Sequence, residues 1–302
     1  MGRALPLLRT LLFVPGDRPD RIAKAAASGA VGIAIDLEDA VAVSRKGVAR
    51  EAVTATLPGL ATKAAPVICV RINAIDSGFA EDDVAALEPA LHRIDLVIVP
   101  MSAEPDGIRR VAQLLSRAER SAATQSGRIG IVPLVETAAG ILNAQTLAAA
   151  DPRVHTLSFG PADLSRELGI VPTADGDEFL FARSQLVLAA AAARCPPPVD
   201  GPYLDLGDDD GLARSASRAR ALGFSGKQVI HPAQIATVAA AFAISSSEIE
   251  WAREVDAAFT AAEAEGVSSI RLPNGTFVDY PVAQRARAIL AYAPPPIAVP
   301  SE

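Results

Sequence analysis

Carboxylates follow short apolar runs at three separate points of the chain. If these runs are strands of one parallel sheet, their carboxyl ends meet at one edge, where clustered carboxylates repel each other unless a cation lies between them. Oxygen ligands of this kind favour Mg²⁺ over softer metals, and the sequence has no Cys or His pair at zinc-binding spacing. We therefore expect a Mg²⁺ site. The carboxylates are Asp36, Glu38 and Asp39 at the first point, Glu136 at the second and Asp163 at the third.

Glu136 and Asp163 are the expected ligands, because Mg²⁺ usually takes one or two protein carboxylates and leaves its other positions to water and substrate. Arg71 follows another apolar run, and its planar, permanently charged guanidinium suits a substrate carboxylate or a developing oxyanion. Gly160 is expected to let the backbone approach a ligand, or simply to satisfy turn geometry. Asp36, Glu38 and Asp39 are predicted to hold waters on the metal, with a helix N-terminal carboxylate as the alternative for the last two.

A regular succession of strands and helices has to position these residues. The apolar runs are β-branched and continuous, as expected for strands buried on both faces, and Ala- and Leu-rich segments of helical length separate them. Eight such alternations predict a (β/α)8 barrel of the α/β class; a doubly wound sheet is the alternative, but no G-x-G-x-x-G follows the first run. The expected strands are 11–14, 32–37, 67–72, 96–99, 129–135, 156–159, 203–206 and 228–230. The expected helices include 20–28, 45–57, 105–123, 139–149, 178–193 and 209–222.

The chain is expected to divide into a barrel over residues 1–243 and a C-terminal extension over 244–302. Ser245 and Glu248 form a helix-start pattern before a helix over 249–265. A hairpin is expected to turn at Asn274-Gly275, and a last helix to run from Pro281 to about residue 292. The proline-rich tail over 294–302 is expected to be disordered.

Composition excludes several classes of protein. Half of the 302 residues are hydrophobic, which excludes a disordered polymer, and a formal net charge of −7 without a basic cluster opposes nucleic-acid binding. Cys69 and Cys195 are the only cysteines, so a cytoplasmic protein without disulfides is expected. We expect no membrane span and no signal peptide, because the apolar stretches are too short or too polar.

Seven motifs in order resemble those of the citrate lyase β-subunit/malyl-CoA lyase family, within the HpcH/HpaI aldolase superfamily. They extend over nearly the whole chain, from the first expected strand to the hairpin. The resemblance implies a Mg²⁺-dependent enzyme that makes or breaks a C–C bond next to a CoA or carrier-protein thioester. The motifs are LLFVPGDRPDRIAKA, GIAIDLEDAV, VRINA, IVPLVETAAGILNA, LSFGPADLSRELG, GFSGKQVIHPAQI and NGTFVDYPV.

The resemblance also implies residue roles. Glu136 and Asp163 fall on the family's metal ligands, and Arg71 falls on its substrate-contacting arginine. Asp279 falls on an acid that a neighbouring subunit brings to the site, which implies a homo-oligomer such as a trimer. In one departure, Pro100-Met101 stands where the family commonly has Pro-Lys, which puts substrate specificity in question. The first expected strand–helix unit supplies the candidate contacts for CoA phosphates, namely Arg18, Arg21 and Lys24.

The resulting hypothesis is a lyase that cleaves a 3-hydroxy-3-carboxyl acyl-CoA, such as malyl-CoA or citramalyl-CoA, to acetyl-CoA and a 2-oxo acid. Arg71, Asp279 and Glu38 are its predicted catalytic residues: Arg71 stabilises the oxyanion and Asp279 transfers the proton at the enolate carbon. The base for the hydroxyl group is left open. His231 is expected to order its loop. The alternatives are a citrate lyase β-subunit acting on a citryl-carrier-protein thioester, a malyl-CoA thioesterase, and a non-catalytic CoA-thioester-binding paralogue.

Overall fold

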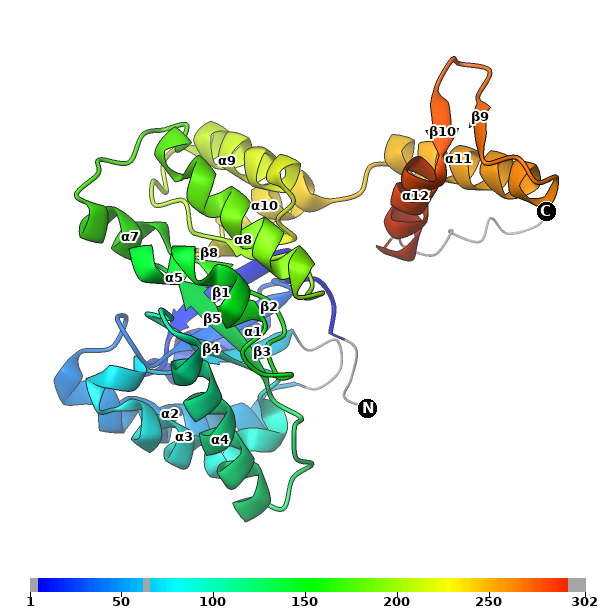
Figure 1. The fold of residues 1–302 in the computed structure, drawn as a ribbon. Helices are drawn as coiled ribbons and strands as arrows, with labels where there is room; N and C mark the ends of the chain where they lie inside the picture. The colour runs from blue at the N-terminus through cyan, green and yellow to red at the C-terminus, as the bar shows by residue number, and fades with distance from the viewer. Residues whose placement is uncertain (1–4, 62–65, 293–302) are drawn as a thin grey trace, which may run out of the picture. The chain divides into compact units, whose positions relative to one another are not determined.

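Eight parallel strands close into a barrel in the computed structural model, which describes residues 5–61 and 66–292 (Figure 1). The strands pair in sequence order, and β8 pairs with β1 through Thr10↔Lys227 to close the cylinder. The predicted (β/α)8 barrel is therefore confirmed. The strands are β1 Thr10–Pro15, β2 Gly32–Asp36, β3 Val67–Arg71, β4 Leu96–Val99, β5 Gly130–Val135, β6 Ser158–Phe159, β7 Val199–Asp200 and β8 Gly226–Val229.

Helices follow the strands and cover the outside of the barrel (Figure 1). Proline lies in the first turn of three of them, where the missing N–H costs nothing. The expected helix over 139–149 is broken at Asn143 into two short helices. The helices of this part are α1 Pro19–Ala26, α2 Lys46–Thr56, α3 Ala80–Leu87, α4 Pro105–Ser121, α5 Ala138–Leu142, α6 Ala144–Ala148, α7 Pro161–Leu168, α8 Leu180–Ala192, α9 Asp209–Leu222 and α10 Gln234–Phe242.

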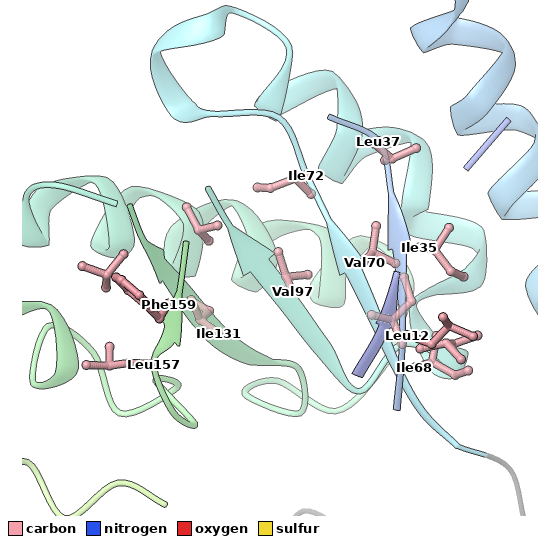
Figure 2. Packing of buried hydrophobic residues seen from close by; sticks show 14 of the residues in the cluster. Leu12, Ile35, Leu37, Ile68, Val70, Ile72, Val97, Ile131, Leu157 and Phe159 are labelled. Carbon is pink, nitrogen blue, oxygen red and sulfur yellow. The ribbon is translucent and has the colours of Figure 1, made fainter. Parts of the chain in front are cut away.

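Strand side chains alternate between two apolar cores, because successive residues of a strand point to opposite faces. One set packs between the strands and the surrounding helices. Figure 2 labels ten of its members, among them Ile35 on β2, Val70 on β3 and Val97 on β4. The other set fills the barrel interior. It consists of Leu8, Leu11, Ala34, Val67, Cys69, Leu96, Ile98, Val132, Leu134 and Val199.

The seventh strand is not where the apolar pattern predicted it. β7 is Val199–Asp200, while the expected run 203–206 lies after it in a loop where Leu204 and Leu206 are exposed. Val199 pairs with Ser158 on β6 and with Gly226 on β8. A two-residue strand with a buried aspartate has no apolar run for periodicity to detect, so the more apolar neighbouring segment was chosen wrongly.

The chain divides into two compact units, Met1–Phe242 and Ala243–Glu302. A capping box between Ser245 and Glu248 starts α11 Ser246–Ala264. The hairpin β9 Ser269–Arg271 and β10 Phe277–Asp279 follows, and then α12 Tyr280–Tyr292. This unit has its own apolar core, which includes Val255, Phe259, Leu272 and Val278. The predicted tail over 294–302 lies outside the described residues. No described helix is long and apolar enough to cross a membrane.

Candidate metal and substrate site

Strand alternation directs three polar side chains to the mouth of the barrel. On β2, β3 and β5 the residue two positions earlier belongs to the inner core, so the polar residue at the strand end points to the same side. The C-terminal ends of all eight strands open to this mouth, which is where barrels of this kind carry their sites. The three residues are Asp36 after Ala34, Arg71 after Cys69 and Glu136 after Leu134.

Arg71 is held by the carboxylates of the preceding strand. Its Nε and Nη2 donate to the two oxygens of Asp36 at 2.7 and 2.5 Å, and its Nη1 lies 2.7 Å from Oε2 of Glu38. The guanidinium also lies over the ring of Phe13, 5.3 Å from its centroid. Asp36 is fully buried and accepts the backbone N–H groups of Glu38 and Ala40 as well. Asp36 therefore orients Arg71, and Nη1 is the part of the guanidinium that faces Glu38.

Glu136 is fixed from two sides. Its Oε1 accepts the backbone N–H of Met101 at 2.7 Å, across from β5 to the end of β4. On the other side Gly160 is packed so closely that a Cβ there would lie 2.4 Å from Oε2 of Glu136. The expected role of Gly160 was close approach of the backbone to a ligand. What approaches it in the structure is the Glu136 carboxylate.

Burial and mutual repulsion disfavour the charged forms of two of these carboxylates. The pKa of Glu38 is raised to about 7, mainly by burial and further by Asp39, Asp36 and Asp163, although Arg71 opposes the shift. The pKa of Glu136 is raised to about 8, again mainly by burial, with Glu38 and Asp163 adding to it against the hydrogen bond from Met101. The cations of the chain therefore do not fully compensate the charged forms of Glu38 and Glu136.

Asp163 brings a further carboxylate to the same place from the first turn of α7. Its charge acts on both Glu38 and Glu136, and its side chain is partly exposed at 27%. Arg166, one turn later, forms an ion pair with it on the exposed side of the helix. Asp39 is also exposed and lies 3.7 Å from Nη1 of Arg71. The structure thus brings together the predicted residues Asp36, Glu38, Asp39, Arg71, Glu136, Gly160 and Asp163.

The donor set fits a Mg²⁺ ion held largely by oxygen ligands. Oε2 of Glu38 is buried and accepts no hydrogen bond. Its contact is the ion pair with Nη1 of Arg71 at 2.7 Å. Glu136, directly after β5, and Asp163, in the first turn of α7, provide two carboxylates, the number that Mg²⁺ usually takes from a protein. Among residues 5–61 and 66–292, no group of three or more His, Cys, Asp or Glu side chains is placed to hold a metal ion by itself. A site that leaves positions to water and substrate is consistent with both observations.

Lys46 is a supporting residue that the sequence analysis missed. It is buried at the start of α2, and its Nζ donates to the carbonyl oxygens of Leu37 and Glu38 at 2.7 Å each. Asn73 donates to the Leu37 carbonyl from the other side. Both residues hold the loop that carries Glu38. In sequence Lys46 looks like part of a solvated helix face, and only its position at the start of the helix, eight residues after Glu38, offered a signal.

The predicted CoA contacts line one cavity beside the mouth. Arg18, Arg21 and Lys24 on the first strand–helix unit lie around a cavity of about 480 Å³ together with His231 and Pro232, which follow β8. Arg18 and Lys24 are exposed, and Arg18 has only a 3.5 Å contact with Asp20. Three cations around one cavity form a surface that suits phosphate groups.

Asp279 lies in the C-terminal unit, at the end of β10. Its Oδ1 accepts the backbone N–H of Val282 at 3.2 Å and so caps the start of α12. The carboxylate is partly buried within its own unit. Its assignment as a proton-transfer group stays a prediction.

Comparisons with known proteins agree with this site. The family described as HpcH/HpaI aldolase/citrate lyase matches residues 9–232. The citrate lyase subunit beta of Leuconostoc mesenteroides subsp. cremoris is 32% identical over 287 residues, covering 95% of this chain and 93% of the relative. The L-malyl-CoA/beta-methylmalyl-CoA lyase of Cereibacter sphaeroides is 33% identical over 303 residues, covering 94% of both chains.

A solved structure extends the likeness to the fold and to bound ligands. Protein CitE of Mycobacterium tuberculosis, in complex with magnesium, acetoacetate and coenzyme A, superposes with a TM-score of 0.76 at 34% identity. The match covers 96% of this chain and 99% of that one. The family expected from the seven motifs is thereby confirmed: with its inward-facing acids at the barrel mouth, this chain belongs to the HpcH/HpaI aldolase/citrate lyase family.

Proposed function

We propose that this chain is a Mg²⁺-dependent carbon–carbon lyase that cleaves a 3-hydroxy-3-carboxyl acyl-CoA to acetyl-CoA and a 2-oxo acid. The observation that carries the proposal is the buried carboxylate cluster at the barrel mouth, where burial and neighbouring acids disfavour the charged forms of Glu38 and Glu136 in spite of Arg71. Glu136 and Asp163 would hold the Mg²⁺ ion. A bound Mg²⁺ supplies a Lewis acid that polarises the oxygens of the substrate's hydroxyl and adjacent carboxylate.

Arg71 orients the substrate and stabilises charge. Asp36 binds Nε and Nη2, while Nη1 pairs with Oε2 of Glu38 at 2.7 Å, so a substrate oxyanion would share Nη1 with Glu38. Because this guanidinium is locked by Asp36 and by the Phe13 ring, it does not have to reorganise as an oxyanion develops. Such a preorganised donor is worth on the order of 3 kcal/mol of transition-state stabilisation.

Two carboxylates handle the protons of the cleavage. The hydroxyl proton passes to Glu38, because its raised pKa of about 7 suits a general base. The carbonyl of the 2-oxo acid then forms, the C–C bond breaks, and its electron pair moves into the enolate of the thioester. Asp279 returns a proton to the enolate carbon. Asp279 lies in a separate unit, and we propose that it reaches the site of a second copy in a homo-oligomer, such as a trimer.

The cavity around Arg18, Arg21 and Lys24 is proposed to bind the CoA phosphates. It adjoins strand β1, whose Phe13 supports Arg71, so a thioester could extend from this cavity toward the mouth. Neutralisation of phosphates by these cations predicts that KM rises with salt concentration. Charge reversal in Lys24→Glu is expected to raise KM more than it lowers kcat, because the CoA phosphates lie far from the reacting bond.

Product analysis tests the function directly. The protein is incubated with malyl-CoA and with citramalyl-CoA, each with Mg²⁺ and with EDTA, and the products are identified by mass spectrometry. Metal-dependent formation of acetyl-CoA with glyoxylate or pyruvate is the expected result. CoA thiol with intact malate would indicate a thioesterase. Turnover only with an acyl-carrier protein would indicate a citrate lyase β-subunit, and tight binding without turnover a non-catalytic paralogue.

A mixing experiment tests the role of Asp279 in a second copy. Glu136→Gln and Asp279→Asn are each expected to lose most activity when pure. When the two are unfolded, mixed and refolded together, mixed oligomers contain sites with both intact residues, and activity returns to a fraction of wild type. Failure of the mixture to regain activity, with oligomers confirmed by mass, would show that Asp279 acts within its own chain or not at all. A cytoplasmic location remains part of this proposal and is testable by fractionation.

A further inference from the structure

A second cavity of about 580 Å³ adjoins the metal site at the end of β4. It lies between the segments that follow β3 and β4 and reaches Thr137, the residue after Glu136. Most of its wall is apolar, and Met101, which is 40% exposed, stands at its edge. The apolar and small wall residues are Ala74, Ile75, Val99, Pro100, Met101, Ala103 and Ile108.

Met101 connects this cavity to the site. Its backbone N–H donates to Oε1 of Glu136 at 2.7 Å, which places the peptide of Met101 directly beside the proposed metal ligand. Its backbone has a φ of 51°, a left-handed conformation that is uncommon for residues other than glycine. Such strain persists only where surrounding contacts impose it, and here the hydrogen bond to Glu136 is one of those contacts. A group bound next to Glu136 therefore meets the Met101 edge of the cavity.

The charges around the cavity oppose a bound carboxylate. Its acids are Asp76, Glu104 and Asp106. The only cation that lines it is Arg110, which forms an ion pair with Glu81 at 2.6 Å. The N-terminus of α4 also faces this region, but Asp106 in its first turn offsets the positive end of the helix dipole. An additional anion placed here would lose its hydration without gaining a free cation.

From this we infer that the cavity receives the substituent on the hydroxyl-bearing carbon of the substrate and selects an alkyl group over a carboxymethyl group. The inference rests on the proposed function, since it concerns the same reacting carbon. A volume of about 580 Å³ exceeds a methyl group by far, so an ethyl group fits as well. The enzyme's substrates are thus 3-hydroxy-3-carboxyl acyl thioesters with an apolar branch, and its second product is a 2-oxo acid with an alkyl chain.

The selectivity is measured on four CoA thioesters that differ only in this substituent: hydrogen, methyl, ethyl and carboxymethyl. We expect kcat/KM for methyl to exceed that for hydrogen by about tenfold and that for carboxymethyl by at least tenfold, with ethyl within tenfold of methyl. A kcat/KM for carboxymethyl equal to or above that for methyl would overturn the inference while leaving the lyase function established.

Met101→Lys places a cation of similar length at the cavity edge, and Met101→Leu is the matched apolar control. The lysine variant is expected to shift the methyl-to-carboxymethyl ratio toward carboxymethyl by at least tenfold, and the leucine variant by less than threefold. Both replacements carry a Cβ like methionine, so the backbone conformation at residue 101 is equally strained in all three proteins. An unchanged ratio in Met101→Lys would contradict the assignment.

Equilibrium binding separates this inference from the proposed function. Pyruvate, 2-oxobutyrate and oxaloacetate are titrated into the Mg²⁺-loaded protein. Weaker binding of oxaloacetate than of 2-oxobutyrate by at least tenfold supports the cavity assignment even if no thioester is cleaved, in which case only the lyase function fails. Equal or tighter binding of oxaloacetate would refute the assignment whatever the activity.

Discussion

Two clusters of the same barrel bury carboxylates, and the pKa values of these carboxylates shift in opposite directions. At β7 and β8, Asp200 accepts from Arg183 Nε at 2.9 Å and from Lys227 Nζ at 2.6 Å, and all three side chains are buried. Burial alone would raise the pKa of Asp200, but Lys227 and Arg183 outweigh it and lower the pKa below its usual value. At the mouth, Glu38 and Glu136 share one arginine with other acids, and their pKa values rise.

The difference separates a structural cluster from a functional one. Both clusters remove carboxylates from water, so desolvation is similar, and what differs is the supply of cations from the chain itself. Asp200 has two, whereas the mouth has Arg71 for several acids. The protein completes the charge balance of the first cluster during folding. In the second cluster the cations of the chain do not outweigh burial, which is consistent with the proposed bound Mg²⁺.

Asp200→Asn should cause the largest change in stability. Removal of the charge leaves Lys227 and Arg183 buried beside a neutral group, and breaking such a buried pair costs about 3–5 kcal/mol of unfolding free energy. Urea unfolding in EDTA measures it. Asp210→Asn, an exposed change on α9, is the control and should stay within about 0.5 kcal/mol of wild type. A loss below about 1 kcal/mol for Asp200→Asn would remove the contrast between the clusters.

The ion pairs of Asp200 also predict that the free energy of unfolding depends on pH. Because the pKa of Asp200 is lower in the folded than in the unfolded protein, its stabilising contribution is present above the unfolded value of 3.8. It is lost as the pH falls through the lower folded pKa. The difference in unfolding free energy between wild type and Asp200→Asn should therefore stay constant at neutral pH and narrow below pH 3.8. A difference that narrowed on raising the pH instead would contradict the assigned sign.

Glu136→Gln should abolish function without a comparable loss of stability. Loss of the proposed metal ligand would remove several kcal/mol of Lewis-acid stabilisation, so kcat/KM is expected to fall at least about a hundredfold and Mg²⁺ binding by calorimetry to disappear. In EDTA the variant should be as stable as wild type or more stable, because a repelled, buried charge is gone. Glu51→Gln, a change at an exposed position of α2, is the control. Destabilisation comparable to that of Asp200→Asn would show that Glu136 is structural.

Gly160→Ala should have a smaller effect, through Glu136. The added methyl group would lie 2.4 Å from Oε2 of Glu136 and has to displace that carboxylate. We expect Mg²⁺ affinity to fall about 10–100-fold, as for other residues that orient metal ligands. Gly107→Ala on α4, where the added methyl group meets no atom within 4 Å, is the matched control and should leave Mg²⁺ affinity unchanged. Equal affinities for the two variants would exclude this positioning role.

Arg166→Gln should produce the smallest effect. Arg166 is exposed, and its ion pair with Asp163 is accessible to water and salt. Its removal frees Asp163, so Mg²⁺ affinity should rise by less than about fivefold. Calorimetric titration at two salt concentrations tests this, and the difference should shrink at higher salt. A weakening beyond tenfold would mean that Arg166 helps to hold the metal site.

Much of the barrel could be predicted from apolar runs alone, because strands buried on both faces leave a continuous signal. Expected and observed bounds agree within two residues for seven of the eight strands. The prediction of β7 was wrong because this strand buries Asp200 through ion pairs with Arg183 and Lys227. Arg183 lies 17 residues earlier in the chain and Lys227 lies 27 residues later. Hydrophobic periodicity depends only on residues close in sequence, so it does not detect a buried charge that distant residues neutralise.

Part of the site could be predicted for the same reason. Asp36 and Arg71 end apolar strands and Glu136 directly follows one, so their meeting at the mouth follows from the barrel geometry. Lys46 and the backbone N–H of Met101 could not be predicted, because a buried lysine in a helical pattern looks solvated and a backbone donor has no sequence signal.

The sequence by itself determined which side chains reach the barrel mouth, since alternation along a strand and the order of the elements are local properties. Only the tertiary structure decided how those side chains share charge. Asp36 locks Arg71, Met101 and Gly160 fix Glu136, and Lys46 holds the loop of Glu38 through contacts between separate elements. Burial and electrostatic interactions depend on distances in space, so the pKa shifts at the proposed metal site arise only when the barrel has closed.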